Sequence, residues 1–444
     1  MKIYNSYTDK LEEFVPKHKN KVGIYVCGPT VYNYIHIGNA RPVVFFDTVR
    51  RYFETIGYDV TFVSNFTDID DKLIKKALEE NISELELSQY FIEAFLNDVA
   101  SLNSKTDYIK PKVTEYMQHI VDYIKILVEK GYAYEVDGDV FFRVTKVNEY
   151  GALSNRNVDD LISGSRIDVN TKKENPLDFT LWKETKEGIN FDSPFSKGRP
   201  GWHTECVAMI DDIFGEEIDI HGGGTDLKFP HHENEIAQAK VAHHHRVATY
   251  WMHNGRLDLK NEKMSKSIGN VILVKDVEDK MALRYFLLST HYRTPLTYSD
   301  DSFAMYVKEW EKLENAHKQL FFKLDIEDAF DDSIEIEDEK ILNEIANFNK
   351  SMDNDFNTAN AITALQAMIK ITNQNIRKPN NQNALNQAFK AFKYMTDILG
   401  FKMEENRVST ENKALYSTWQ TARKEKDFEQ ADILRKQLTE KGIL

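Results

Sequence analysis

The chain has 444 residues, of which 41% are hydrophobic and 29% charged, and this composition is typical of a folded protein with two to four domains. A formal net charge of −14 argues against a general nucleic-acid coat, although a local basic groove could still bind RNA. No apolar run is long enough to predict a membrane span, and the polar N-terminus is unlike a signal peptide, so we expect a cytoplasmic protein.

Residues 22–63 predict a βαβ unit. VGIYV reads as a buried strand and DVTFV as the next one, with a helical pattern between them that Gly57 is expected to end. The apolar face of that helix is expected to hold Val44, Phe45, Val49, Tyr52, Phe53 and Ile56. This order indicates an α/β fold with a parallel sheet, whose ligands bind at the carboxyl ends of the strands.

The loop after the first strand contains Cys27 in a Gly-Pro context and then HIGN, residues 36–39, where the helix should begin. Backbone N–H groups and the helix dipole favour an anion at such a position. His36 could donate to a phosphate, and Gly38 would let a nucleotide approach the backbone. Taken alone, this motif is a weak signal.

Further along, residues from about 110 to 200 interrupt the α/β rhythm and are interpreted as an insertion in the core. The core resumes near Arg199 and continues to about residue 300. A dense acidic run, about 325–339, predicts an exposed linker, because like charges repel and solvate well. Residues 340–400 read as helical, and a last helix pair closes the chain.

The second cysteine, Cys206, lies far from Cys27 in the sequence, and only two cysteines are present, so a disulfide framework is excluded. His231 and Glu235 are spaced to share one face of a helix. Two thiolates, an imidazole and a carboxylate would form a sensible zinc set. On spacing alone, His232 and Glu233 are rival ligands, and two buried cysteines without a metal are the plain alternative. The run His243–His245 is interpreted as solvated surface, because consecutive helical residues point in different directions.

A second short motif, KMSKS at residues 263–267, supplies Lys263 and Lys266 in a loop that could clamp a triphosphate. Alone it would be read as surface. In this order and around an α/β core, HIGN and KMSKS together are far more specific than either motif.

With these motifs on view, the chain resembles the bacterial cysteinyl-tRNA synthetases of class I over almost its whole length. The resemblance rests on CGPTVYNYIHIGNAR, NFTDIDDK, PLDFTLWK, GRPGWHTEC, DIHGGGTDLKFPHHENE, KMSKS and MDNDFNTANA. It implies a Rossmann-type catalytic domain over 1–305, a helical stem and tRNA-binding bundle over 306–400, and a small anticodon-binding region over 401–444. Asn39 stands where the family more usually has histidine.

The resemblance also implies roles for residues. Zinc would be held by Cys27, Cys206, His231 and Glu235. Trp202 and His203 flank the thiol site in the sequence, and we expect them to close over the substrate cysteine; the alternative is that Trp202 is a core residue. Catalysis is expected from His36, Asn39, Lys263 and Lys266. ATP, carried with Mg²⁺, would be bound by Gly28, Thr30, His36, Gly38, Asn39, Gly224, Asp226 and Lys266. The expected partners are L-cysteine, ATP and tRNA(Cys), and the expected state is a monomer.

The chemistry fits these residue types. Phosphoryl transfer of this kind needs positioning and charge stabilisation more than a protein nucleophile. Shape discriminates poorly between serine and cysteine, whereas a thiolate is a strong zinc ligand and an alcohol a weak one. Near the C-terminus, basic side chains would suit an RNA backbone and Trp419 could stack on an unpaired base; these basic residues are Arg423, Lys424, Lys426, Arg435 and Lys436.

Two alternatives remain at this point. One is a cysteine ligase acting on an amino-sugar, which would lack the C-terminal RNA-binding region. The other is a noncatalytic zinc- and RNA-binding relative, which would not need intact HIGN and KMSKS motifs.

Overall fold

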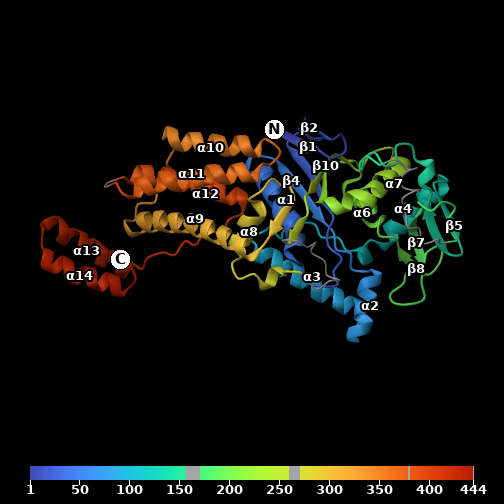
Figure 1. Ribbon diagram of the computed structural model, residues 1–444, viewed down its shortest axis with the longest axis horizontal. Coiled ribbons are helices and arrows are strands. Elements are labelled where there is room, and N and C mark those ends of the chain that lie inside the picture. The colour runs from blue at the N-terminus through green and yellow to red at the C-terminus, as the bar shows by residue number, and fades with distance from the viewer. Residues whose placement is uncertain (157–170, 260–270, 379–380, 444) are drawn as a thin grey trace. The chain divides into compact units, whose positions relative to one another are not determined.

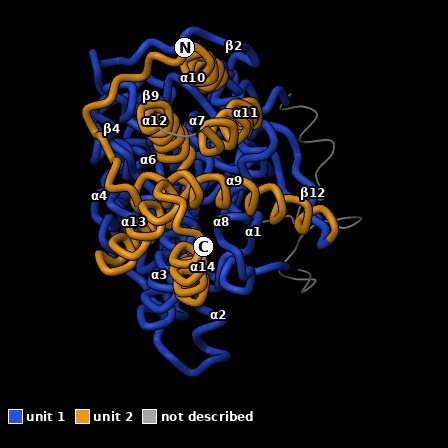
Figure 2. The backbone as a smooth tube through the Cα atoms, turned by 90° about the vertical axis from the view of Figure 1, so that its left-hand side faces the viewer, with its two compact units in different colours: residues 1–300, 353–357 blue, residues 301–352, 358–444 orange. Residues whose placement is uncertain are grey.

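The computed structural model describes residues 1–156, 171–259, 271–378 and 381–443. The chain forms two compact units, residues 1–300 with 353–357 and residues 301–352 with 358–444 (Figure 2). Among the described residues, no helix combines the length and the apolar character that crossing a membrane would require.

A four-stranded parallel sheet forms the centre of the first unit, and the predicted α/β fold is confirmed (Figure 1). Its strand order is β10-β9-β3-β4, with β3 at Lys21–Val26, β4 at Asp59–Ser64, β9 at Ile218–Gly224 and β10 at Ala248–Asn254. The chain passes from β3 to β4 on one side and later reaches β9 on the other. The sheet therefore has a switch point beside β3, and the carboxyl ends of strands at such a point are where α/β sheets bind ligands.

Helix α1 (Ile37–Thr55) connects β3 to β4 and buries most of the expected apolar face. The exception is Ile56, which follows the helix and is 39% exposed, so its assignment to that face was wrong. Gly57 has φ +93°, in the left-handed region that favours glycine after a helix end.

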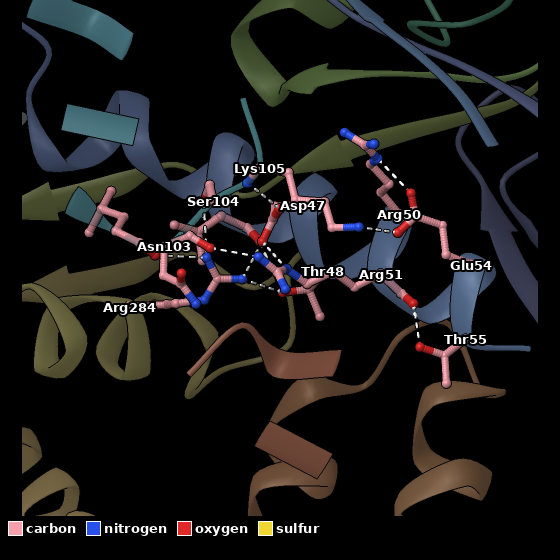
Figure 3. Close-up of polar contacts among 12 residues, drawn as sticks. Asp47, Thr48, Arg50, Arg51, Glu54, Thr55, Asn103, Ser104, Lys105 and Arg284 are labelled. Atoms are coloured by element: carbon pink, nitrogen blue, oxygen red, sulfur yellow. Dashed lines mark hydrogen bonds and ion pairs between the residues drawn. The ribbon is translucent and has the colours of Figure 1, made fainter. Parts of the chain in front are cut away.

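A buried polar network fixes α1 to its surroundings (Figure 3). Asp47 accepts hydrogen bonds from Arg284 Nη2 at 2.6 Å, Arg51 Nε at 2.8 Å and the Lys105 backbone N–H at 2.8 Å. Arg284, on α8 (Lys280–Leu288), also donates to the Leu102 carbonyl at 2.9 Å. The helix is thereby joined to α8 and to the segment that follows α3 (Glu84–Ser101).

The segment interpreted as an insertion contains an antiparallel sheet of order β5-β6-β7-β8. Its strands are β5 Ala133–Val136, β6 Asp139–Phe142, β7 Phe179–Glu184 and β8 Gly198–Pro200. The helices near it are α4 Met117–Glu129, α6 Glu205–Phe214 and α7 Glu233–His243. A core cluster that includes Ile124, Phe142, Trp182 and Trp251 joins this sheet and α4 to β10.

The remaining elements of the first unit are short or peripheral. They are β1 Lys2–Asn5, β2 Lys10–Glu13, α2 Asp71–Glu80, η1 Val113–Glu115, η2 Val144–Lys146, η3 Thr225–Leu227, η4 Lys228–His232, β11 Leu257–Leu259, η5 Val274–Asp276 and β12 Leu296–Tyr298.

The second unit is helical among its described residues. Its helices are α9 Asp300–Ile326, α10 Glu339–Met352, α11 Thr358–Ile376, α12 Gln382–Leu399, α13 Thr410–Glu425 and α14 Phe428–Glu440. We expected the acidic run to be an exposed linker, but its first residue differs. Asp325 belongs to α9, is buried, and accepts hydrogen bonds from Arg407, Lys413 and the Val408 N–H. A carboxylate with three donors can be buried without an unpaired charge.

Between α10 and α11, residues 353–357 leave the second unit and complete the first. Phe356 is fully buried and packs edge-to-face against Phe45, Tyr52 and Phe53. Asp355 accepts from the Tyr4 N–H at 2.8 Å. The helical pattern of residues 340–400 is therefore interrupted where the chain returns to the core of the first unit.

Candidate active site

A cavity of about 750 Å³ opens at the carboxyl ends of β3, β9 and β10. It brings together residues from distant motifs, and those expected from the sequence are Cys27, Gly28, His36, Gly38, Asn39, Gly224 and Asp226. Thr30 is not among the lining residues; it forms a backbone bridge with Thr67 instead.

At the N-terminus of α1, His36 and Asn39 cap the helix reciprocally. His36 Nδ1 accepts from the Asn39 N–H at 3.2 Å, and Asn39 Oδ1 accepts from the His36 N–H at 3.3 Å. This cap uses one ring nitrogen and the amide oxygen, so contact with a nucleotide would be made through His36 Nε2 and Asn39 Nδ2. The Ile37 N–H donates to the Ile272 carbonyl and the Asn39 N–H to His36, so the preference for negative charge at this end comes from the dipole of α1.

The glycines near the cavity are required by packing. A Cβ on Gly28 would lie 1.6 Å from the Asn65 carbonyl oxygen, and one on Gly222 would lie 2.1 Å from the Phe46 ring. Gly28 N–H donates to Asn65 Oδ1 at 2.9 Å. These positions bring β3 and β9 close to α1 and β4, which is a different use of glycine from direct contact with a nucleotide.

Two overlapping clusters of metal-ligating side chains lie beside the cavity. One is Cys27, Cys206, His231 and Glu235; the other is Cys27, His221, His232 and Glu235. Within each cluster the ligand atoms lie within 4.8 Å of one another. The structure thus brings the four residues expected to hold zinc to one place from β3, α6, η4 and α7.

Glu235 belongs to both clusters and contacts a histidine of each. Glu235 Oε1 lies 2.9 Å from His231 Nε2, and its Oε2 lies 2.6 Å from His221 Nε2. His232 Nδ1 lies 2.8 Å from His253 Nε2. His231 also has a second histidine partner, since its Nδ1 lies 3.1 Å from His203 Nδ1, so each cluster is surrounded by further polar groups of the kind that orient metal ligands. The cluster with both thiols offers more anionic donors, which zinc prefers.

The rival Glu233 is engaged elsewhere. Its Oε2 accepts from the Ser154 N–H and the Ser154 hydroxyl, both at 2.9 Å, and Glu233 appears in neither metal cluster of the described residues. The histidines His243–His245 are also outside both clusters.

The protonation states of the cluster follow from its contacts. A hydrogen bond from Cys27 and the nearby His231 lower the pKa of Cys206 to about 6, whereas burial raises the pKa of Cys27 well above its usual value. Burial opposes charge on Glu235, but His221 and His231 hold the pKa of that carboxyl well below its ordinary range. One thiolate and one carboxylate therefore face a cation-binding centre at neutral pH.

Trp202 and His203 border this centre. The Trp202 indole stacks on His231 with ring centroids 4.4 Å apart and is 44% exposed, so it is not a core residue. His203 Nδ1 lies 3.1 Å from His231 Nδ1. Burial, with a smaller contribution from His231, lowers the pKa of His203 to about 3, so that its ring is neutral.

Lys263 and Lys266 lie outside the described residues. The chain that follows their segment is bonded to the start of α1: Ile37 N–H donates to the Ile272 carbonyl at 2.9 Å, and Val274 N–H donates to the Ile35 carbonyl at 3.0 Å. The HIGN motif is therefore bonded directly to the residues that follow the KMSKS segment.

Sequence reasoning missed Arg41, although HIGNAR contains it. Its buried guanidinium donates from Nη1 to the Gly255 carbonyl at 2.6 Å and from Nη2 to the His291 carbonyl at 3.3 Å. Burial lowers its pKa to about 10, which leaves it charged at neutral pH. Arg41 thus joins α1 to the cavity wall that begins at Gly255. This role could not be read from the sequence, because the groups that accept its hydrogen bonds are carbonyls and a hydroxyl more than 200 positions away.

At the other end of the chain, Trp419 lies in the hairpin of α13 and α14. It is partly buried, packs on Ala422, Ala431 and Leu434 between α13 and α14, and is covered by Arg423 at 4.7 Å. Phe428, at the start of α14, is the exposed aromatic residue of this hairpin at 70% exposure.

Two family models match the chain. The class I (C) tRNA synthetase catalytic domain matches residues 13–308, and the DALR domain matches residues 347–404.

Similar proteins cover the whole chain. A cysteine–tRNA ligase of Geobacillus thermodenitrificans (strain NG80-2) is 46% identical to this chain, over 100% of this chain and 96% of the relative. One of Finegoldia magna (strain ATCC 29328) is 47% identical, over 100% of this chain and 97% of the relative.

Among solved structures, methionyl-tRNA synthetase of Mycobacterium tuberculosis with methionyl-adenylate has a TM-score of 0.61 at 15% identity, covering 85% of this chain and 90% of that one. A leucyl-tRNA synthetase complex from Agrobacterium radiobacter K84 has a TM-score of 0.61 at 10% identity, covering 88% and 84%. At these identities the likeness concerns the fold.

Proposed function

Because the chain belongs to the cysteine–tRNA ligase family of class I tRNA synthetases, we propose that a zinc ion held by Cys27, Cys206, His231 and Glu235 selects the cysteine that it activates. The enzyme joins L-cysteine to tRNA with ATP. We further propose that tRNA(Cys) is the cognate acceptor, that Mg²⁺ accompanies ATP, and that the enzyme is a cytoplasmic monomer.

The reaction has two balanced steps. The cysteine carboxylate attacks the α-phosphorus of ATP, and the bond to pyrophosphate breaks to leave cysteinyl-adenylate. The terminal ribose hydroxyl of tRNA then attacks the acyl carbon, loses its proton and displaces AMP. Neither step needs a protein nucleophile, so the protein contributes orientation and charge stabilisation.

For the first step, the phosphates are assigned to the N-terminal end of α1. His36 Nε2 and Asn39 Nδ2 are donors on one side, where the dipole of α1 also favours negative charge, and Lys263 and Lys266 are proposed to neutralise the charge that develops on pyrophosphate. Asp226, which lines the same cavity, would accept from the ribose hydroxyls. The Arg41 contacts hold the wall beside the nucleotide in place.

For substrate selection, the donor set fits zinc: two thiols, an imidazole and a carboxylate converge within bonding reach of one centre. Zinc bound there would supply a coordination position that prefers a thiolate to an alcohol. His221 orients Glu235, and Trp202, stacked on His231, can cover the bound side chain. A hydrophobic pocket alone would reject serine only weakly.

One observation supports this proposal most: Cys27, a member of the metal cluster, lines the same cavity as His36 and Asn39, so a thiol of the cluster and the proposed phosphate donors share one space. The test is cysteine-dependent exchange of pyrophosphate into ATP, followed by charging of tRNA(Cys), with serine as the competing substrate. We expect both activities with cysteine and exchange with serine at background. Serine-dependent exchange comparable with that of cysteine would contradict thiol selection, and exchange without charging would favour the amino-sugar ligase.

The match of residues 347–404 to the DALR domain disfavours that ligase, because a helical RNA-binding region is the feature such a ligase would lack. Sedimentation of the purified protein tests the proposed monomer.

A further inference from the structure

An exposed group of tyrosines and lysines lies next to the cavity without forming part of its wall. We call Tyr32, Tyr34, Lys72, Tyr90 and Lys275 the tyrosine–lysine patch. Its members come from four places: the segment before α1, α2, α3 and η5. Pro29 and His36 line the cavity, and both Tyr32 and Tyr34 lie in the segment between them.

The rings of the patch are held edge to face. The Tyr34 ring is 6.2 Å from Tyr90 and 5.4 Å from Phe91, with interplanar angles of 77° and 88°. The hydroxyl groups of Tyr34 and Tyr90 are hydrogen-bonded to each other. Tyr90 is nevertheless 54% exposed, so a large part of its side chain remains in contact with solvent. The patch is thus an ordered aromatic surface beside the cavity entrance.

The lysines give the patch positive charge. Lys275 Nζ lies 3.7 Å from the centre of the Tyr34 ring, and Lys72 Nζ lies 5.8 Å from that of Tyr32. Both lysines are exposed, and neither forms an ion pair with a carboxylate among the described residues. Their neighbours on α2 differ, since Lys75 pairs with Glu79 and Lys76 with Glu80. On a chain of net charge −14, two exposed lysines that form no ion pair among the described residues, beside tyrosines packed edge to face, favour an anionic, aromatic ligand.

Single-stranded RNA has both properties. Its phosphates are attracted to lysine, and its unpaired bases stack on aromatic side chains, whereas the bases of a duplex expose only their edges. The reacting hydroxyl of tRNA lies at the end of such a single strand, and it must reach the acyl group inside the cavity. We propose that the tyrosine–lysine patch binds the unpaired 3′ strand of tRNA and guides it over the rim of the cavity. This inference rests on the proposed tRNA charging activity.

The alternative is that the patch only supports the active site. Lys275 follows directly after residues 272–274, which are bonded to residues 35–37 at the start of α1. If the patch mainly held these segments together, its loss would impair adenylate formation, which needs no tRNA. The rate of adenylate formation in variants of the patch therefore distinguishes the two roles.

The experiment compares Tyr90→Ala and Lys72→Ala with two controls. Tyr90→Phe keeps the ring, and Lys75→Ala removes a lysine of the same helix that already has a carboxylate partner. Each full-length variant is assayed for pyrophosphate exchange, for charging, and for binding to tRNA(Cys) with its complete 3′ end or lacking the last three nucleotides.

We expect both alanine variants at the patch to bind complete tRNA about tenfold more weakly, in line with the loss of one stacked base or one phosphate contact. Their affinity for the shortened tRNA should equal that of the wild type, and exchange should stay within about twofold of it. Tyr90→Phe and Lys75→Ala should bind both forms as the wild type does.

Equal losses on complete and shortened tRNA would place the contact on the duplex and overturn the inference, as would unchanged binding of both. A parallel loss of exchange in Tyr90→Ala would assign the patch to support of the active site. If the wild type exchanges pyrophosphate but charges no tRNA, the proposed function itself fails, and that result is distinct from any outcome among the variants.

Discussion

Among single side chains, Cys206 is the one on which the proposed recognition of the substrate thiol depends most. It is buried, lies 3.7 Å from both Cys27 Sγ and His231 Nε2, and has a pKa lowered to about 6. A serine there would be nearly the same size but would offer zinc a poor ligand. With serine at this position, the zinc site would keep only three of its four proposed ligands.

We expect Cys206→Ser to lose zinc and cysteine-dependent pyrophosphate exchange together, because the ligand set and the thiol site share one centre. Elemental analysis of the purified variant and exchange kinetics measure the two effects. His243→Ala, which removes an imidazole outside both clusters, should keep both properties. A Cys206→Ser protein with a full complement of zinc and normal exchange would refute the assignment.

For Lys266→Ala we expect adenylate formation to fall while folding is retained. Loss of a charge-assisted contact to the developing pyrophosphate should raise the activation barrier by about 2–4 kcal/mol, as for other preorganised electrostatic groups. Pyrophosphate exchange gives the rate, and circular dichroism checks folding. A well-folded variant that exchanges at the wild-type rate would remove Lys266 from the mechanism.

These residues differ in how far the sequence could identify them. HIGN and the i,i+4 pair His231 and Glu235 are local patterns, so they could be recognised directly. Cys27 and Cys206 are 179 positions apart, so spacing alone made a shared zinc set only one of several readings, and the resemblance was needed to choose His231 and Glu235 over their rivals. His221 and Arg41 were not selected because their roles depend on partners that local spacing does not reveal.

At the scale of elements, α1 carries the phosphate-facing end of the site and is held by buried charge. The apolar periodicity predicted the strand–helix–strand unit, since packing on a parallel sheet needs one broad apolar face. It could not predict Asp47, because a polar residue within a helix is normally read as solvent-exposed. Its partner Arg284 is 237 positions away and fully buried on α8.

We expect Asp47→Asn to destabilise the protein by about 3–5 kcal/mol, because it leaves Arg284 buried without its counter-charge. Exchange should fall as well, since α1 would no longer be fixed to α8. Thermal unfolding and exchange kinetics measure these effects. As a control, Glu79→Gln removes an exposed ion pair and should change stability by less than about 1 kcal/mol.

The same contact should depend on pH. Arg284 and Arg51 overcome the effect of burial and hold the pKa of Asp47 below its ordinary value. A depressed folded-state pKa gives stability that is present above the unfolded pKa of about 4 and is lost as the pH falls through the folded value. The difference in Tm between wild type and Asp47→Asn should therefore narrow below about pH 4. A constant difference over that range would contradict the ionised pair.

At the scale of the whole molecule, we expect catalysis and RNA selection to belong to different units of the chain. The cavity and both metal clusters lie in the first unit, whereas the hairpin α13–α14 belongs to the second. The basic residues expected to meet RNA are exposed on that hairpin: Arg423, Lys424, Lys426, Arg435 and Lys436. The sequence indicated the basic pattern, but the packing of Trp419 between the two helices and the exposure of Phe428 could not be read from composition.

We expect Phe428→Ala to lower charging of tRNA(Cys) by about tenfold in kcat/KM, the effect of losing one base stacked on an aromatic ring. Pyrophosphate exchange should not change, because the hairpin contributes nothing to the cavity. Ile433→Ala, an exposed apolar residue of the same helix, is the matched control and should charge normally. Normal charging by Phe428→Ala would locate base recognition elsewhere.

The return of residues 353–357 to the first unit has a consequence for how the protein is made. A ribosome that has translated the first 300 residues has not yet supplied Phe356, so Phe45, Tyr52 and Phe53 lack the ring that covers them. At typical synthesis rates the missing segment follows roughly 3–10 s later. During that interval the nascent chain carries an uncovered aromatic surface, at which chaperones or other growing chains can bind before α10 has been completed.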